Sequence, residues 1–209
     1  MLQSASIVYG QMCVQLIAPA KPSAALRLKP NTSSMSDAKA RLQDLLPEAY
    51  PRIYRGVAGL TYGSGLNAED LTQEVFLKAF RKAGTFQGDS AIYTWLFSIA
   101  RNTCHDAMRR LKVKRRLGLD YEFAPNEELW KAPDEGDPLV GREEHRLLQK
   151  ALARLPENHR ELIVYKDLQE MTYVEIGEII GIPEGTVKSR LFKARLLLKE
   201  ELEKLGYTP

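Results

Sequence analysis

Basic, hydroxyl and aromatic side chains alternate with apolar ones in residues 184–198, at the spacing of an α-helix. The apolar positions fall on one narrow stripe and are expected to pack on a domain: Val187, Leu191, Ala194 and Leu198. The opposite and flanking positions hold Lys188, Ser189, Arg190, Phe192, Lys193 and Arg195. Cations bind phosphates or guanine edges, and a flat apolar side chain can meet a thymine methyl. The pattern predicts a helix that reads the DNA major groove.

The segment in front of this helix has the residues of a tight turn between two helices. An apolar stripe at i, i+3 and i+4 is formed by Ile176, Ile179 and Ile180. Gly177 is small where two helices would cross, and Gly181 suits the left-handed residue that ends a helix. Ile182 is an apolar plug, and Pro183 fits the start of the next helix. A solvated basic helix is the alternative, but the turn residues favour a helix-turn-helix that binds DNA.

A second candidate nucleic-acid surface lies on the helix expected after a turn at Gly88 and Asp89, with Ser90 as its N-cap. Its expected buried face is Leu96, Ala100, Thr103, Ala107 and Leu111. The rest of the helix carries Trp95, Ser98, Arg101, Asn102, His105, Arg109 and Lys112, followed by Lys114, Arg115 and Arg116. Aromatic rings among cations suit single-stranded DNA, because bases stack on rings while cations follow the phosphates. Trp95 as a core aromatic and Asn102 as a surface amide remain open alternatives.

An acidic helix face precedes these residues. Leu71, Val75 and Ala79 are expected in the core, whereas the other face carries Asp70, Gln73, Glu74 and Leu77. Spacing alone favours a solvated surface at these four positions.

These segments belong to a chain that is predicted to be all-α, with two small helical domains. Residues 37–116 form the first domain and residues 142–209 the second, which contains the helix-turn-helix. Residues 117–141 between them are rich in Asp, Glu and Pro and are expected to be an acidic flexible linker. The net charge of +3 is weak, so the local distribution of charge carries the argument.

Residues 1–36 contain no Asp or Glu and show no sustained helical period, which predicts a disordered N-terminal extension. A functional arm is a less favoured alternative. An organelle transit peptide is also less favoured, since the segment is poor in Arg. A start of translation at Met35 is a further alternative, because the residues after it resemble an N-cap and a helix start.

Two blocks together resemble the extracytoplasmic-function (group IV) sigma factors of the sigma-70 family. The first block contains Glu69, Asp70, Gln73, Glu74 and Phe76, then Phe86, Gly88 and Ser90, then Thr94, Trp95, Leu96, Ala100 and Asn102. The second contains Leu155 and Pro156, then the run from Gly185 and Thr186 to Leu191, and ends in Ala194 and Arg195. The resemblance covers about residues 37–207. Lys188 departs from a position where Arg is also common, and Ile92 from one where Phe is frequent.

The resemblance implies a role for each surface. The face with Asp70, Gln73, Glu74 and Leu77 would bind core RNA polymerase. The −10 element, as a single strand with a flipped base, would be captured by Phe86, Gly88, Ser90, Trp95, Arg101, Asn102, His105 and Arg109. The −35 element, as duplex, would be read by Gly185, Thr186, Lys188, Ser189, Arg190, Phe192, Lys193 and Arg195. The acidic linker would occupy a cationic channel of the polymerase until RNA displaces it.

Other function classes have less support from the sequence. A stand-alone repressor or activator could use the same helix-turn-helix, and would bind duplex DNA tightly without polymerase. No phosphate-binding loop, zinc motif or Ser/His/Asp set is present, so neither an enzyme nor a cofactor, metal or small-molecule substrate is expected. Cys13 and Cys104 form no metal-ligand pair, which fits a reducing cytoplasm. The resemblance further implies an anti-sigma factor, which in this family can hold the protein at the inner membrane.

Overall fold

A computed structural model describes residues 35–86, 91–119 and 140–207. These residues are helical, with turns and no strand among them, which confirms the predicted all-α class. The chain divides into two compact units, each of which has its own buried core.

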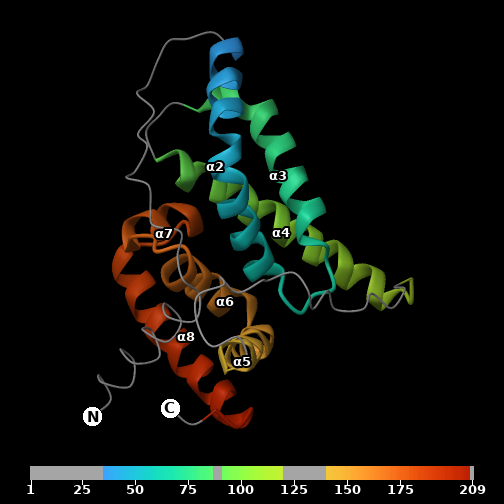
Figure 1. Ribbon diagram of the computed structural model, residues 1–209, viewed down its shortest axis with the longest axis vertical. Helices are drawn as coiled ribbons and strands as arrows, with labels where there is room; N and C mark the ends of the chain where they lie inside the picture. The colour runs from blue at the N-terminus through green and yellow to red at the C-terminus, as the bar shows by residue number, and fades with distance from the viewer. Residues whose placement is uncertain (1–34, 87–90, 120–139, 208–209) are drawn as a thin grey trace. The chain divides into compact units, whose positions relative to one another are not determined.

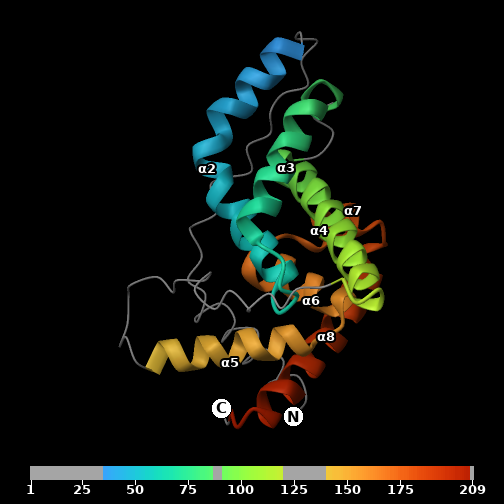
Figure 2. The same cartoon turned by 90° about the vertical axis from the view of Figure 1, so that its right-hand side faces the viewer.

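In the described residues, the first unit has three long helices and a short connecting turn (Figure 1). They are α2 (Met35–Thr61), α3 (Ala68–Lys82), the 3₁₀ turn η1 (Ala83–Thr85) and α4 (Ile92–Arg116). Each long helix packs against the other two, as Figure 2 also shows for α2 beside α3 and α3 beside α4. Asn67 is the N-cap of α3, and its side chain accepts hydrogen bonds from the Glu69 and Asp70 amides. This unit positions the acidic face on α3 and the cationic face on α4.

Two helix starts differ by one or two residues from the sequence prediction. The described part of α2 begins at Met35, ahead of the Ser36 expected as its N-cap. Helix α4 begins at Ile92, and Ala91 occupies the N-cap position without a side-chain hydrogen bond. Ser90, the expected cap, lies outside the described residues. Shifts of this size are expected, because the hydrophobic period of a sequence predicts which face of a helix is buried better than it predicts where the helix ends.

Within the described residues, the second unit has four helical segments and corresponds to the predicted second domain. It contains α5 (Val140–Arg154), α6 (Glu157–Ile163) continued by a π-helical turn η2 (Val164–Leu168), α7 (Tyr173–Ile180) and α8 (Glu184–Lys204). Its core includes the fully buried Leu148, Tyr165, Ile176, Leu191 and Leu198. Helix α5 begins at Val140, two residues before the predicted start of this domain at residue 142, and α6 continues directly into η2.

Helices α7 and α8 form the predicted helix-turn-helix, and the turn residues act as expected. Gly181 has a φ of 79°, the left-handed conformation that ends α7. Gly177 must be small, because a Cβ atom there would lie 2.7 Å from the carbonyl oxygen of Ile182. Pro183 occupies the N-cap of α8. At the other end of α7, Thr172 and Glu175 form a capping box.

Candidate nucleic-acid interface

Helix α8 separates its apolar and polar faces as the sequence predicts. Val187, Leu191, Ala194 and Leu198 are buried. The exposed surface carries Gly185, Lys188, Ser189, Arg190, Phe192 and Lys193, with Thr186 half-buried at its edge. Phe192 is 47% exposed, although burial of such a ring is normally favourable. An exposed phenyl ring among cations is a surface that suits DNA.

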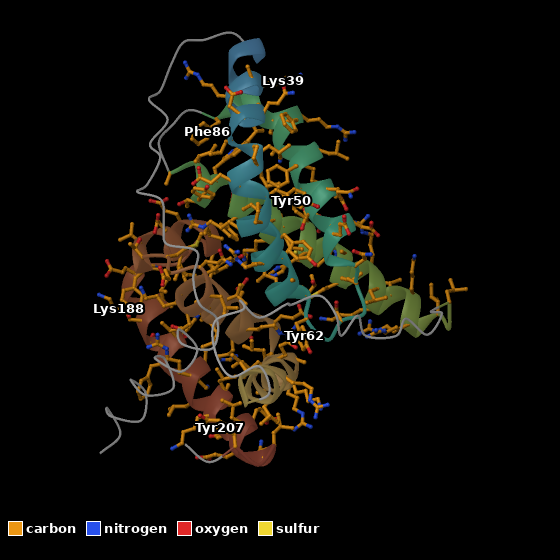
Figure 3. All side chains as sticks on the ribbon, viewed as in Figure 1. Lys39, Tyr50, Tyr62, Phe86, Lys188 and Tyr207 are labelled. Atoms are coloured by element: carbon orange, nitrogen blue, oxygen red, sulfur yellow. The ribbon has the colours of Figure 1, made fainter. Side chains whose placement is uncertain are left out.

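Lys188 is held in place by two neighbours on this surface. Its Nζ lies 2.6 Å from a carboxylate oxygen of Glu184, one turn earlier in α8, and 5.3 Å from the centre of the Tyr173 ring. The hydrogen bond to Glu184 raises the pKa of Lys188. Lys166 of η2 lies over the same ring, with its Nζ 4.8 Å from the centre. Two cations thus meet at Tyr173, and Lys188 lies at the outer surface of its unit (Figure 3).

Arg195 lies elsewhere than the exposed face on whose flank the sequence places it. Its guanidinium forms two hydrogen bonds with the carboxylate of Asp167 on η2, one of them 3.2 Å from Nε to Oδ2. The side chains of Asp167 and Arg195 are only 3% and 22% exposed. Burial raises the pKa of Asp167, and the Arg195 guanidinium opposes that rise. The pair fixes α8 to η2, a role that no local sequence signal reveals because the partners are 28 residues apart.

His159 lies near the exposed face of α8, although nothing in the sequence pattern predicts that it does. Its imidazole Nδ1 is buried and has no hydrogen-bond partner within the described ranges. Burial lowers the pKa of His159, and the nearby Lys193 and Arg190 lower it further. These two cations belong to the exposed face of α8. The first turn of α6 therefore lies beside the candidate DNA-reading surface and brings a titratable ring to it.

The second candidate surface runs along α4. Its predicted buried residues are buried, except for Leu111, which is half-buried. Asn102, Arg109 and Lys112 are exposed, whereas Ser98, Arg101 and His105 are half-buried. Arg109 donates a hydrogen bond to Asp106 at 2.8 Å, one turn earlier.

An aromatic pair lies at the start of the same helix. The rings of Phe86 and Trp95, both half-buried, are 5.3 Å apart between centres and tilted by 54°. Figure 3 labels Phe86 beside the first turns of α4. Trp95 is thus neither fully buried nor fully exposed, and its ring packs against that of Phe86. Gly88 and Ser90, predicted to complete this pocket, lie outside the described residues.

On α3 the four predicted contact residues differ in their surroundings. Asp70 and Gln73 are exposed, and the apolar side chain of Leu77 is 58% exposed. Glu74 is different, because it lies 2.7 Å from Lys78 Nζ and 3.9 Å from the Arg110 guanidinium of α4. Three of the four side chains therefore face outward, and Glu74 also ties α3 to α4.

The described residues give no sign of a reactive thiol, a metal site or a membrane-spanning helix. Cys104 is buried beside α3, and burial raises the pKa of its thiol to about 12, which makes it unreactive. No cluster of His, Cys, Asp or Glu in residues 35–86, 91–119 and 140–207 could hold a metal ion. None of the helices described has the length and apolarity needed to cross a membrane.

Family models match both units. Residues 45–113 match the model described as Sigma-70 region 2, and residues 145–198 match the one described as Sigma-70, region 4. The chain belongs to the sigma-70 family. It is 33% identical over 189 residues to the ECF RNA polymerase sigma factor SigW of Bacillus subtilis, covering 86% of this chain and 96% of SigW. It is 31% identical over 170 residues to the RNA polymerase sigma-H factor of Pseudomonas aeruginosa, covering 79% and 88%.

A solved structure has the same architecture. The sigma factor RpoE from Bartonella quintana, crystallised with the anti-sigma factor NepR, superposes with a TM-score of 0.64 at 28% identity. The match covers 79% of this chain and 98% of RpoE. The protein is therefore an RNA polymerase sigma factor of the extracytoplasmic-function type, as the sequence predicted. Members of this family are transcription-initiation factors and are not enzymes, so the prediction of no enzymatic activity is confirmed by family membership.

Proposed function

We propose that this sigma factor brings core RNA polymerase to promoters through three surfaces, one on each of α3, α4 and α8. The first functional domain corresponds to residues 37–116 and the second to residues 142–209. The division of α8 into a buried apolar stripe and an exposed basic face with Phe192 is the observation that carries the proposal. A helix of this kind after a tight turn inserts its polar face into the major groove.

The −35 element is read by the exposed face of α8. Arg190 and Lys193 contact phosphates or guanine edges, Ser189 offers a hydroxyl, and Phe192 meets thymine methyl groups. Lys188 makes one point contact, because an ammonium group cannot form the two parallel hydrogen bonds of a guanidinium. Gly185 and Thr186, at the start of the helix, approach the sugar-phosphate backbone of the DNA. Arg195 contributes by holding α8 at its angle through Asp167.

The −10 element is captured as a single strand on α4. One unstacked base enters the pocket beside the Phe86 and Trp95 rings, and the exposed amide of Asn102 hydrogen-bonds its edge. Gly88 and Ser90 belong to the loop that closes this pocket. Arg101, His105 and Arg109 follow the phosphates along the helix. Unstacking costs a few kcal/mol, which stacking on the rings and the cation contacts offset.

The polymerase binds the outward face of α3. Leu77 supplies the apolar centre of this contact, and Asp70 and Gln73 supply polar partners around it. Glu74 contributes through its ion pairs with Lys78 and Arg110, which keep α3 and α4 in register.

An anti-sigma factor is the second proposed protein partner. The Bartonella relative was solved with one, and the fold that it binds is shared here. We place the protein in the cytoplasm, where polymerase and promoters are, with sequestration at the inner membrane when its anti-sigma factor is membrane-bound.

The test is run-off transcription with core bacterial polymerase and a randomised promoter library. The full chain is expected to yield specific transcripts that Asp70→Ala or Asn102→Ala abolishes. Matched controls are Asp44→Ala and Gln43→Ala, an exposed acid and an exposed amide on α2 that should leave the transcripts unchanged. If the polymerase gains no promoter selectivity while the chain alone binds duplex DNA tightly, the proposed mechanism is wrong.

A further inference from the structure

The last turns of α4 and the residues after them form a surface of mixed character, which we term the α4-end patch. Residues 109–119 contain no acid and hold the cations Arg109, Arg110, Lys112, Lys114, Arg115 and Arg116. Among them, Val113, Leu117 and Leu119 are 51%, 65% and 64% exposed. They are three of the six large apolar side chains that are exposed in the described part of the chain. The patch is therefore both strongly cationic and apolar.

DNA alone explains only half of this composition. Phosphates match the cations, but they gain nothing from exposed valine and leucine side chains. A better match is a polypeptide that carries carboxylates together with large apolar side chains. Val113 and Leu117 are one helical turn apart, and neighbouring exposed apolar side chains mark an interaction surface when they form a contiguous patch.

Residues 120–139 of the same chain have that composition. Seven of these residues are acidic and only Lys131 is basic: Asp120, Glu122, Glu127, Glu128, Asp134, Glu135 and Asp137. Interspersed with the acids are Tyr121, Phe123, Leu129, Trp130 and Leu139. The segment follows directly after Leu119, so it is tethered to the patch that it matches in charge and apolarity.

The segment is long enough to reach the DNA-binding face of α4. Twenty extended residues span up to about 66 Å, whereas the 25 residues of α4 span about 37 Å. A tether this short gives an effective concentration in the millimolar range. Arg101, His105, Arg109 and Lys112 share one side of the helix, and carboxylates bound along it would take the places of DNA phosphates.

We propose that residues 120–139 bind the α4-end patch in the free sigma factor and compete there with single-stranded DNA. The inference rests on the proposed function, because it takes α4 as the surface for the −10 strand. Polymerase uncovers the patch, because the acidic segment moves into a cationic channel of the polymerase. The free protein is thereby kept from binding single-stranded DNA in the absence of polymerase.

The first test compares two full-length variants with the same change in charge. One carries Asp120→Asn, Glu122→Gln, Glu127→Gln and Glu128→Gln. The control carries Glu170→Gln, Glu178→Gln, Glu200→Gln and Glu203→Gln, four exposed acids of the second unit. The probe is fluorescein-labelled dT20 at low salt. The linker variant is expected to bind roughly tenfold more tightly than the control, with the difference shrinking as salt rises. Equal affinities would overturn the proposal.

The second test observes the segment directly and contains no polymerase. Trp95→Phe leaves Trp130 as the one tryptophan of the chain. Its emission is expected to move to longer wavelength when dT20 or high salt displaces the segment, and to start there in the linker variant. An emission that ignores all three changes would reject the docking. Loss of promoter selectivity in run-off transcription would instead reject the proposed function, so the two failures are distinguishable.

Discussion

Arg190 and Arg195 lie five residues apart on the same helix, yet their surroundings give them different tasks. Arg190 is exposed on the proposed DNA-reading face, whereas Arg195 is paired with the buried carboxylate of Asp167. Removal of one member of a buried pair leaves an uncompensated charge, which costs more than the pair itself contributes. Substituting Arg195 should therefore affect mainly stability, and substituting Arg190 mainly DNA binding.

We predict that Arg195→Met lowers the free energy of unfolding by about 3–5 kcal/mol, as measured by urea denaturation. Arg190→Met is the matched control and should change stability by less than about 0.5 kcal/mol, while weakening binding to −35 duplex. Equal stability of the two variants would mean that the Asp167 pair does not hold α8 in place.

His159 predicts a pH dependence of stability in the second unit. Burial and the neighbouring Lys193 and Arg190 lower its pKa in the folded protein, so the unfolded chain binds a proton more readily. The free energy of unfolding should thus fall as pH drops below about 6.5, the ordinary value for histidine. His159→Gln should remove that part of the fall between pH 7.5 and 5.5, whereas His105→Gln in the other unit should keep it. An unchanged pH profile in His159→Gln would contradict the inference.

At the scale of elements, the turn between α7 and α8 sets the angle between these two helices and thus the direction in which the exposed face of α8 points. Its two constraints are the left-handed Gly181 and the contact of Gly177 with the Ile182 carbonyl. Neither residue contacts DNA in the proposed mechanism, but both determine where the face of α8 points.

Gly177→Ala should therefore destabilise the domain by about 1–3 kcal/mol, because the new Cβ meets a backbone oxygen that must shift. The matched change is Gly185→Ala in the first turn of α8, where a Cβ meets nothing within 4 Å. That variant should gain about 0.5–1 kcal/mol through the better helix propensity of alanine. Thermal denaturation followed by circular dichroism measures both, and a stabilised Gly177→Ala would rule out the close contact.

At the scale of the molecule, each unit has its own buried core, and the proposed −10 and −35 surfaces lie on different units. The connecting segment then has a thermodynamic role beyond any contact it makes. Once one unit is bound to a promoter, the tether turns binding of the other into an intramolecular step.

Separate fragments of residues 35–119 and 140–207 should accordingly each show helical circular dichroism. Their equimolar mixture should nevertheless give at least roughly 100-fold less run-off transcript than the intact chain, because the effective concentration is lost. A mixture as active as the intact protein would show that linkage contributes nothing.

Much of this protein follows from local sequence pattern. Hydrophobic period fixed the buried faces of α3, α4 and α8, since a 3.6-residue repeat leaves little freedom in which side of a helix faces the core. Turn chemistry located Gly181 and Pro183, because few residues tolerate those backbone conformations. The family likeness followed from two spaced motifs.

Tertiary structure decided what depends on residues far apart in the chain. The bond of Arg195 to Asp167, the approach of His159 to Lys193, and the ties of Glu74 to Lys78 and Arg110 change what each side chain can do. Among these, only the pair of Glu74 and Lys78 has a helical spacing that a sequence displays. Such contacts form where packing brings the side chains together, and that packing is a property of the whole domain. Sequence thus determined which face of each helix is polar, and the fold determined which polar groups stay available to DNA and polymerase.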